Sequence, residues 1–251
     1  MVGTLALIGM SDLGYVTLGK DQGRIPTFEI ERYLLAQSAS QQVLYVPTAT
    51  SEWGPERAGL SARAADLLEH NVGAQMVVAE LWDREAADDP DLVAAAEEAA
   101  FIYLGGGRPG PLAAALRGSR FWETVVARYR DGAVLAGESA GSIVLTEYTL
   151  GGSEAGFEYL PEGLGVLPQL KVVPHADTAK GQHILTAALA GAPPAVTVLS
   201  IPEFTAVVRE PDGSWRQIGE GGAVLFQEGT SLSLEGLSSV EPRLVPWEGS
   251  A

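Results

Sequence analysis

The chain has 251 residues, and 46% of them are hydrophobic. This share supplies a sizeable core and excludes a disordered protein. With 32 acidic and 16 basic side chains the formal net charge is −16, which opposes a phosphate backbone, so we expect no nucleic-acid partner. The absence of cysteine excludes disulfides, thiolate-bound metals and a cysteine nucleophile.

The length favours one domain spanning residues 1–251. Residues 1–9 carry no basic leader and are typical of a first strand rather than of a signal peptide. No apolar run approaches the ~20 residues that a membrane helix needs, so we expect no membrane partner. These features and the lack of cysteine agree with the cytoplasmic location that we expect.

In the first half of the chain, short apolar runs alternate with helical patterns. The strand patterns cover residues 5–9, 42–47, 75–81, 101–104 and 133–136, and the helical patterns cover 56–71, 90–99 and 119–130. Asp89-Pro90 and Ser119 are typical helix starts. Strands separated by helices of this length predict an α/β protein with a mostly parallel sheet covered on both faces. Segments 24–30 and 48–55 are expected to be loops near the ligand-binding edge of that sheet.

The last third of the chain changes character. A strand pattern over 171–174, a helix over 178–190 and a strand over 196–201 come first. The segments 204–209, 215–218 and 222–226 then predict antiparallel hairpins. We expect these hairpins to be an antiparallel extension of the same sheet rather than a separate domain.

The segment Gly137-Glu138-Ser139-Ala140-Gly141 follows a strand pattern and precedes a helix-like run. This order predicts a nucleophile elbow, a sharp strand-to-helix turn that exposes the serine hydroxyl at the positive end of a helix. A serine that merely caps the helix is the alternative for this pentapeptide alone. The elbow hypothesis makes Ser139 the nucleophile of a covalent acyl-transfer enzyme.

A serine nucleophile needs a base, and the chain has three histidines. His70 lies at the end of a predicted helix, where the helix dipole alone explains it, and His183 lies in the middle of another helix. His175 directly follows a predicted strand, which puts it on the same sheet edge as Ser139. His175 is therefore the expected general base.

The residue that orients the histidine has several candidates. Glu203 follows the strand pattern 196–201 and has apolar neighbours, an unfavourable place for an unpaired carboxylate. Asp177 is close to His175 in sequence, and Glu154 lies in a Gly- and Ser-rich loop. Glu203 is the preferred candidate, with Asp177 and Glu154 as the alternatives.

An oxyanion hole requires two backbone N–H groups that face the developing negative charge. The N–H of Ala140, directly after the nucleophile, is one candidate. The loop Gly105-Gly106-Gly107 follows a strand pattern, and Gly106 or Gly107 can supply the other, because glycine lets the main chain approach a substrate closely. A phosphate-binding turn is the alternative, but the Gly-Lys-Ser/Thr of a Walker motif is missing.

These residues, in the order Ser139, His175 and Glu203, resemble the peptidase E and cyanophycinase family of serine peptidases. The resemblance covers most of the chain and includes the triple glycine, Gly163-Leu164-Gly165, Val173-Pro174-His175 and Ile201-Pro202-Glu203. It implies a single class I glutamine amidotransferase-like domain, a three-layer α/β/α sandwich with a flavodoxin-like sheet. It also implies that Glu203 is the triad acid, as in the cyanophycinase branch.

The chain departs from the family pattern at three places. Arg108 stands where the family often has asparagine, and Ala176 where an aromatic residue often follows the histidine. The helix after His175, residues 179–185, contains none of the arginines that both branches carry there. We therefore expect a specificity other than strict Asp-X, and Arg108 is a candidate for binding a substrate carboxylate from a different position.

The sequence thus predicts a serine peptidase, a dipeptidase or other small-peptide exopeptidase, that needs no metal or organic cofactor. Its partner is a small peptide substrate. Two alternatives are an α/β-hydrolase-type esterase, which orders its triad Ser, acid, His, and a non-catalytic amidotransferase-like binding protein. The sequence leaves open the bond that is cleaved, the role of Glu138 and the oligomeric state, a homodimer included.

Overall fold

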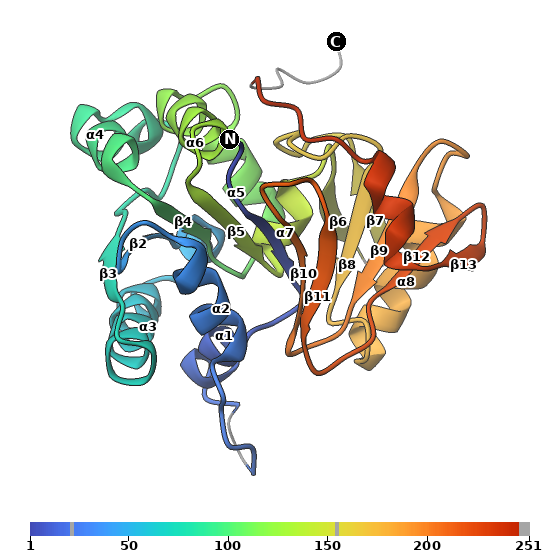
Figure 1. Cartoon of the computed structure of the whole chain (residues 1–251), viewed down its shortest axis with the longest axis horizontal. Coiled ribbons are helices and arrows are strands. Elements are labelled where there is room, and N and C mark those ends of the chain that lie inside the picture. Colours follow the sequence, from blue (N-terminus) through green and yellow to red (C-terminus); the bar gives the residue numbers. More distant parts are fainter. Residues whose placement is uncertain (21–22, 154–155, 246–251) are drawn as a thin grey trace.

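The structure is a computed structural model that describes residues 1–20, 23–153 and 156–245. Within these ranges the chain forms a three-layer α/β/α sandwich around a seven-stranded sheet, in the order β11-β10-β1-β5-β4-β2-β3 (Figure 1). The strands β1, β5, β4, β2 and β3 are parallel, and β10 and β11 add an antiparallel edge. Their bounds are β1 (Leu5–Ile8), β2 (Gln42–Val46), β3 (Gln75–Val78), β4 (Phe101–Leu104), β5 (Val134–Glu138), β10 (Thr205–Arg209) and β11 (Trp215–Gly219). The predicted fold class is confirmed.

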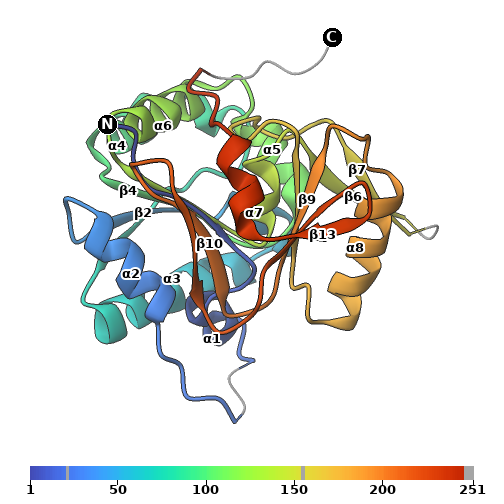
Figure 2. The same ribbon diagram turned by 45° about the vertical axis from the view of Figure 1, so that its right-hand side comes forward.

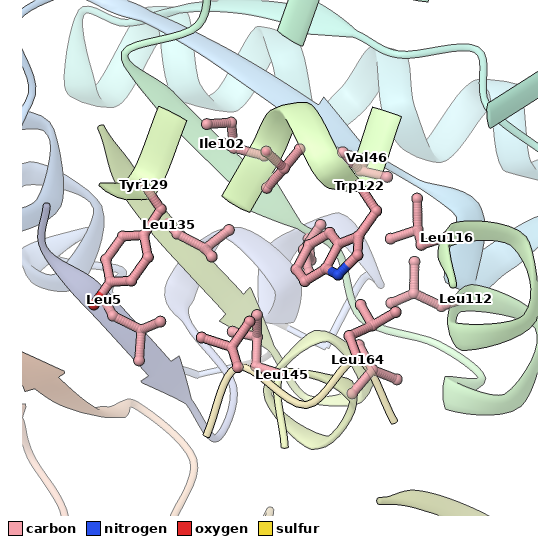
Figure 3. Close-up of a cluster of buried hydrophobic side chains, with 14 of the residues drawn as sticks. Leu5, Val46, Ile102, Leu112, Leu116, Trp122, Tyr129, Leu135, Leu145 and Leu164 are labelled. Carbon is pink, nitrogen blue, oxygen red and sulfur yellow. The ribbon is translucent and has the colours of Figure 1, made fainter. Parts of the chain in front are cut away.

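Helices cover both faces of this sheet because its strands are apolar on both faces. Ala6 and Ile8 of β1 pack in one cluster with side chains of α2 (Glu29–Gln37) and α3 (Glu56–Val72). Leu5 and Leu7 pack in the other, which Figure 3 shows around Trp122. The second cluster draws on α4 (Pro90–Glu98), α5 (Pro109–Leu116), α6 (Arg120–Arg130) and α7 (Ala140–Val144). No helix of the described part of the chain is long and apolar enough to cross a membrane.

The expected helix starts are present. The side chain of Asp89 accepts a hydrogen bond from the Asp91 N–H at the start of α4, and Pro90 occupies the first helical position. The Ser119 side chain accepts a hydrogen bond from the Trp122 N–H at the start of α6. These caps satisfy backbone donors that a helix N-terminus leaves unpaired.

The expected antiparallel extension of the main sheet by segments 204–209, 215–218 and 222–226 is confirmed for the first two, β10 and β11, and wrong for the third, which joins another sheet. Of the later strands, β10 and β11 join that sheet, while the described residues also form a four-stranded sheet in the order β13-β12-β9-β8 (Figures 1 and 2). Its strands are β8 (Leu170–Pro174), β9 (Thr197–Ile201), β12 (Val224–Gln227) and β13 (Thr230–Leu232), and α8 (Ala179–Ala190) connects the parallel pair β8 and β9. The strands β6 (Thr149–Ser153) and β7 (Gly156–Leu160) form a hairpin that pairs with neither of these sheets. Hairpin signals are local and do not specify which sheet edge a strand joins, so the sequence could not separate the two sheets.

The two predicted loops contain short helices. The 3₁₀-helix η1 (Thr48–Trp53) occupies most of segment 48–55, and α2 begins at Glu29, inside segment 24–30. The six-residue helix α1 (Asp12–Thr17) directly follows β1 and was not expected. Two further 3₁₀-helices are η2 (Ala86–Asp88) and η3 (Leu234–Ser239). The segments α1 and η1 matter because both lie next to Ser139 in the cavity described below.

Candidate active site

Ser139 is the single residue between β5 and α7. Its backbone has φ 51° and ψ −105°, a conformation that a non-glycine residue adopts only where the surroundings enforce it. A Cβ on Gly137 would collide with the backbone of Gly141, and a Cβ on Gly141 would collide with the Leu104 carbonyl. The turn from strand to helix is therefore so tight that glycine is required at both positions.

His175 follows β8 and reaches the serine from the second sheet. Its Nε2 lies 2.8 Å from Ser139 Oγ, and its Nδ1 lies 2.9 Å from Glu203 Oε1. His175 also has a positive φ of 54°, which turns the chain sharply at the end of β8. The structure therefore brings Ser139, His175 and Glu203 into one chain of hydrogen bonds.

Backbone hydrogen bonds tie the second sheet to the main one at this point. The segment after β9 forms a parallel bridge between Glu203 and Met10, which follows β1. The Phe204 N–H donates to the Met10 carbonyl (2.6 Å), and the Gly9 N–H donates to the Thr205 carbonyl (3.0 Å). The contacts of Met10 with Glu203 and Phe204 hold the carboxyl end of β1 beside the segment that follows β9, while the Gly9–Thr205 bond continues the β1–β10 pairing. This explains how residues from two sheets share one site.

The acidic partner of His175 in the structure is Glu203. Its side chain is 14% exposed, and the hydrogen bond with His175 lowers the pKa of this carboxyl although burial alone would raise it. Asp177 has a different partner, because its Oδ1 accepts a hydrogen bond from the Glu203 backbone N–H (2.8 Å). Asp177 thus fixes the backbone that carries Glu203. The other alternative, Glu154, lies outside the described residues.

The triple-glycine loop lies against the serine. A Cβ on Gly106 would be 3.4 Å from the Ser139 Cβ, so the two backbones are close. Across the described residues, the N–H groups of Gly106 and Gly107 donate to no other backbone group. Ala140 is the first residue of α7, where N–H groups have no partner within the helix. The N–H groups near Ser139 therefore come from two segments, the triple-glycine loop and the start of α7.

A cavity of about 410 Å³ opens beside these residues. Ser139, His175, Glu203, Gly106 and Gly107 all line it, together with side chains from α1, η1 and α3. Lys20 and Lys180 are the lysines on its wall.

The other candidates from the sequence lie away from this cavity. Arg108 is 65% exposed and forms an ion pair with Glu52, and it is not among the cavity-lining residues. His70 is exposed on α3 and bonds the Asp66 carbonyl at 2.8 Å. His183 is exposed on α8. Neither histidine approaches Ser139 in the hydrogen-bond network described above.

Sequence reasoning left Glu138 without a role, and the structure gives it one. Glu138 is 3% exposed, and its Oε1 accepts hydrogen bonds from the N–H (2.8 Å) and the hydroxyl (3.1 Å) of Ser11, the N-cap of α1. Its Oε2 accepts from the Tyr103 hydroxyl at 3.1 Å. Glu138 therefore links the strand that ends at the serine to α1 and to β4. A glutamate within a fully buried strand was the signal that could have indicated such a network.

A second buried carboxyl, Glu31 of α2, lies close enough to Glu138 for their charges to interact. It is 3% exposed and accepts a hydrogen bond from the Leu13 N–H at 2.8 Å. Burial raises the pKa of Glu138, and burial, with a smaller contribution from the Glu138 charge, raises the pKa of Glu31 to about 7.

We expect Glu31→Gln to remove a pH dependence of stability. The protonated form is favoured in the folded state, so the wild-type free energy of unfolding should fall as pH rises from 4.5, the ordinary pKa of a glutamate, to about 7. The shift corresponds to about 3 kcal/mol, and glutamine should avoid that loss. Urea unfolding at pH 5 and pH 8 measures it. Glu29→Gln, an exposed carboxyl on the same helix, is the matched control and should retain the wild-type fall. Equal pH dependence of wild type and Glu31→Gln would contradict the prediction.

Comparisons with known proteins place this fold. No curated protein matches the chain. A crystal structure of a peptidase from an acI-B1 Actinobacterium has a TM-score of 0.73 and 24% identity over 93% of this chain and 98% of that one. A putative peptidase E protein from Listeria monocytogenes EGD-e has a TM-score of 0.57 and 13% identity over 88% of this chain and 100% of that one. At these identities the two structures establish likeness of fold alone. The model of peptidase family S51 matches residues 18–215, and the chain therefore belongs to this family of serine peptidases.

Proposed function

We propose that the protein is a serine peptidase that hydrolyses small peptides through a Ser-His-Glu triad. Ser139 is the nucleophile, His175 the general base and Glu203 the acid that orients the imidazole. The observation that carries this proposal is the continuous pair of hydrogen bonds, 2.8 Å from Ser139 Oγ to His175 Nε2 and 2.9 Å from His175 Nδ1 to Glu203 Oε1. Nucleophile, base and orienting group within hydrogen-bond reach are the geometry that such catalysis needs.

The reaction has two steps. Ser139 Oγ attacks the carbonyl carbon of the scissile bond while its proton passes to His175 Nε2. The C–N bond breaks, the leaving amine takes that proton, and the acyl group remains as an ester on Ser139. Water then attacks the ester with its proton passing to Nε2, and this proton returns to Ser139 Oγ as the carboxylic acid leaves.

Charge that develops on the substrate oxygen needs preorganised donors. We assign this role to the N–H of Ala140 and to that of Gly106 or Gly107. The proposal is supported by the position of Ala140 at the first turn of α7 and by the lack of a backbone acceptor for the two glycine N–H groups in the described chain. The helix dipole of α7 adds to the same field, although with five residues its contribution is small.

Small peptides with a free terminus are the substrates that suit this site. The cavity of about 410 Å³ is of ligand size, and Lys20 and Lys180 on its wall can attract a free carboxylate. Arg108, the earlier candidate for that role, is already paired with Glu52. We therefore assign carboxylate attraction to the two lysines and infer an exopeptidase or dipeptidase that is not restricted to Asp-X bonds.

A fluorophosphonate probe tests the nucleophile directly. We expect one adduct for each folded chain, located on Ser139 by peptide mapping, and none after unfolding in urea. Ser142, three residues further on, is an internal control, because its hydroxyl is buried and accepts a hydrogen bond from the Ile8 N–H (2.8 Å). Failure to label Ser139 would favour the non-catalytic binding protein and overturn the proposal.

A further inference from the structure

The cavity beside Ser139 has an apolar wall that the triad does not use. Leu13 and Leu18 come from α1 and its C-terminal cap, Trp53 from η1, and Leu60 and Ala64 from α3. All three helices lie within the described residues, and none contributes a charged side chain to the cavity lining. This wall would leave a substrate carboxylate unpaired, which is costly away from water.

Two of these side chains are exposed although they are large and apolar. Leu18 is 38% exposed and Trp53 is 36% exposed. Single exposed apolar side chains are ordinary on a protein surface, but here they face the same cavity as the nucleophile. An apolar group of the substrate would cover them and remove that area from water.

The chemistry of the leaving group shows which side of the scissile bond this wall serves. His175 Nε2 must protonate the leaving amine, so the leaving part of the peptide lies against His175 and the residues after it, such as Lys180. Lys20 lines the same cavity. Lys180 and the histidine therefore share the leaving-group side.

The α3 part of the apolar wall, Leu60 and Ala64, lies on the opposite side of the serine, whereas α1 follows β1 and contacts the Glu203 segment through the packing of Tyr15 on Phe204. Figure 1 shows α3 on one side of β5 and the β8–β9 pair on the other. The helix α3 connects β2 and β3, which are separated from β5 by β4, so it is displaced along the sheet away from the strands that carry His175 and Glu203. The acyl part of a substrate bound to Ser139 has this side available.

We propose, on the basis of the function proposed above, that the enzyme prefers peptides with a large apolar residue on the acyl side of the scissile bond. The side chain of that residue occupies the space between α1, η1 and α3, and Leu60 is a specificity-determining residue. The leaving residue carries a free carboxylate toward Lys20 and Lys180.

A set of dipeptides and tripeptides tests the preference in the wild-type protein. The acyl-side residue is varied among Leu, Phe, Gly, Asp and Arg with alanine as the leaving residue, and the reversed sequences are measured in parallel. We expect kcat/KM for Leu and Phe on the acyl side to exceed that for Gly, Asp and Arg by at least about 10-fold. A preference for Asp, no preference, or an apolar preference confined to the leaving side would overturn the inference.

The variant Leu60→Arg introduces a cation into the wall. It should lower kcat/KM for Leu and Phe peptides by at least about 10-fold and raise it for acidic acyl-side residues. Ala62→Arg is the matched control, because Ala62 is exposed on the same helix outside the cavity lining and should keep the wild-type profile. Thermal unfolding of both variants checks the fold. An unchanged profile in a folded Leu60→Arg protein would contradict the role of Leu60.

Labelling of Ser139 distinguishes a failure of the apolar preference from a failure of the proposed function. A protein that labels at Ser139 and hydrolyses peptides without the apolar preference retains the proposed function and loses this inference. A protein that neither labels nor hydrolyses any peptide of the set loses both.

Discussion

Replacing Ser139 by alanine should lower kcat for peptide hydrolysis by on the order of 10⁴-fold or more. Without the hydroxyl no acyl-enzyme forms, and His175 has no proton to accept from a nucleophile. Among the described residues the side chain makes one hydrogen bond, to His175, so the free energy of unfolding should change by no more than about 1 kcal/mol. Steady-state hydrolysis and urea unfolding of the same preparation measure both quantities.

Ser142→Ala supplies the opposite pattern. Its hydroxyl accepts the Ile8 N–H in the buried junction between β1 and α7, and removing the acceptor leaves that donor unpaired. The variant should lose about 1–3 kcal/mol of stability while keeping a nucleophile and far more activity than Ser139→Ala.

For Ser139→Ala itself, hydrolysis at the wild-type rate would show that another residue carries the reaction.

Three of the six non-glycine residues with a positive φ in the described part of the chain lie at the proposed site. Ser139, His175 and Phe204 all have positive φ values, of 51°, 54° and 56°, and all stand at or just after the ends of buried strands. Such conformations cost of order 1–3 kcal/mol each and persist only when packing enforces them. At Phe204 the hydrogen bond to the Met10 carbonyl and the neighbouring bond from Gly9 to Thr205 provide that enforcement. The two-sheet frame therefore holds the hydrogen-bonded residues in their arrangement.

Much of this arrangement was predictable because its signals are local. The strand before Ser139 and the caps at Asp89 and Ser119 depend on residue spacing and on short-range hydrogen bonds, and the structure contains each of them. The positions of Ser139, His175 and Glu203 after strand patterns placed them at strand ends, which is where they lie. For these three residues, their place in the chain after a strand pattern was enough to predict where they lie in the sheets.

The remaining features depend on contacts through space. The second sheet forms because β12 pairs with β9 rather than with β11, and no local pattern encodes that choice. The hydrogen bond from the Ser11 N–H to Glu138 joins two residues that are 127 positions apart in sequence. The apolar wall near Ser139 joins residues of α1, η1 and α3, of which only α3 was predicted. Pairing and packing, rather than periodicity, decide these features.

The triad acid can be assigned by comparing two carboxyl-to-amide variants. We expect Glu203→Gln to lower kcat by about 10³- to 10⁴-fold, because an amide neither enforces the correct imidazole tautomer nor stabilises the imidazolium that forms in the transition state. Asp177→Asn should lower kcat by less than about 10-fold, since the asparagine carbonyl can still accept the Glu203 N–H.

Both substitutions remove one negative charge and keep the shape of the side chain, so a general electrostatic effect would reduce the two activities alike. The difference between the variants instead depends on which carboxylate contacts the histidine, and Glu203 Oε1 is the atom 2.9 Å from His175 Nδ1. Because the hydrogen bond with His175 lowers the pKa of Glu203, the carboxylate is present throughout the neutral range in which the assay is run. A large loss in Asp177→Asn together with a near-wild-type Glu203→Gln would transfer the orienting role to Asp177 and refute the Ser-His-Glu assignment.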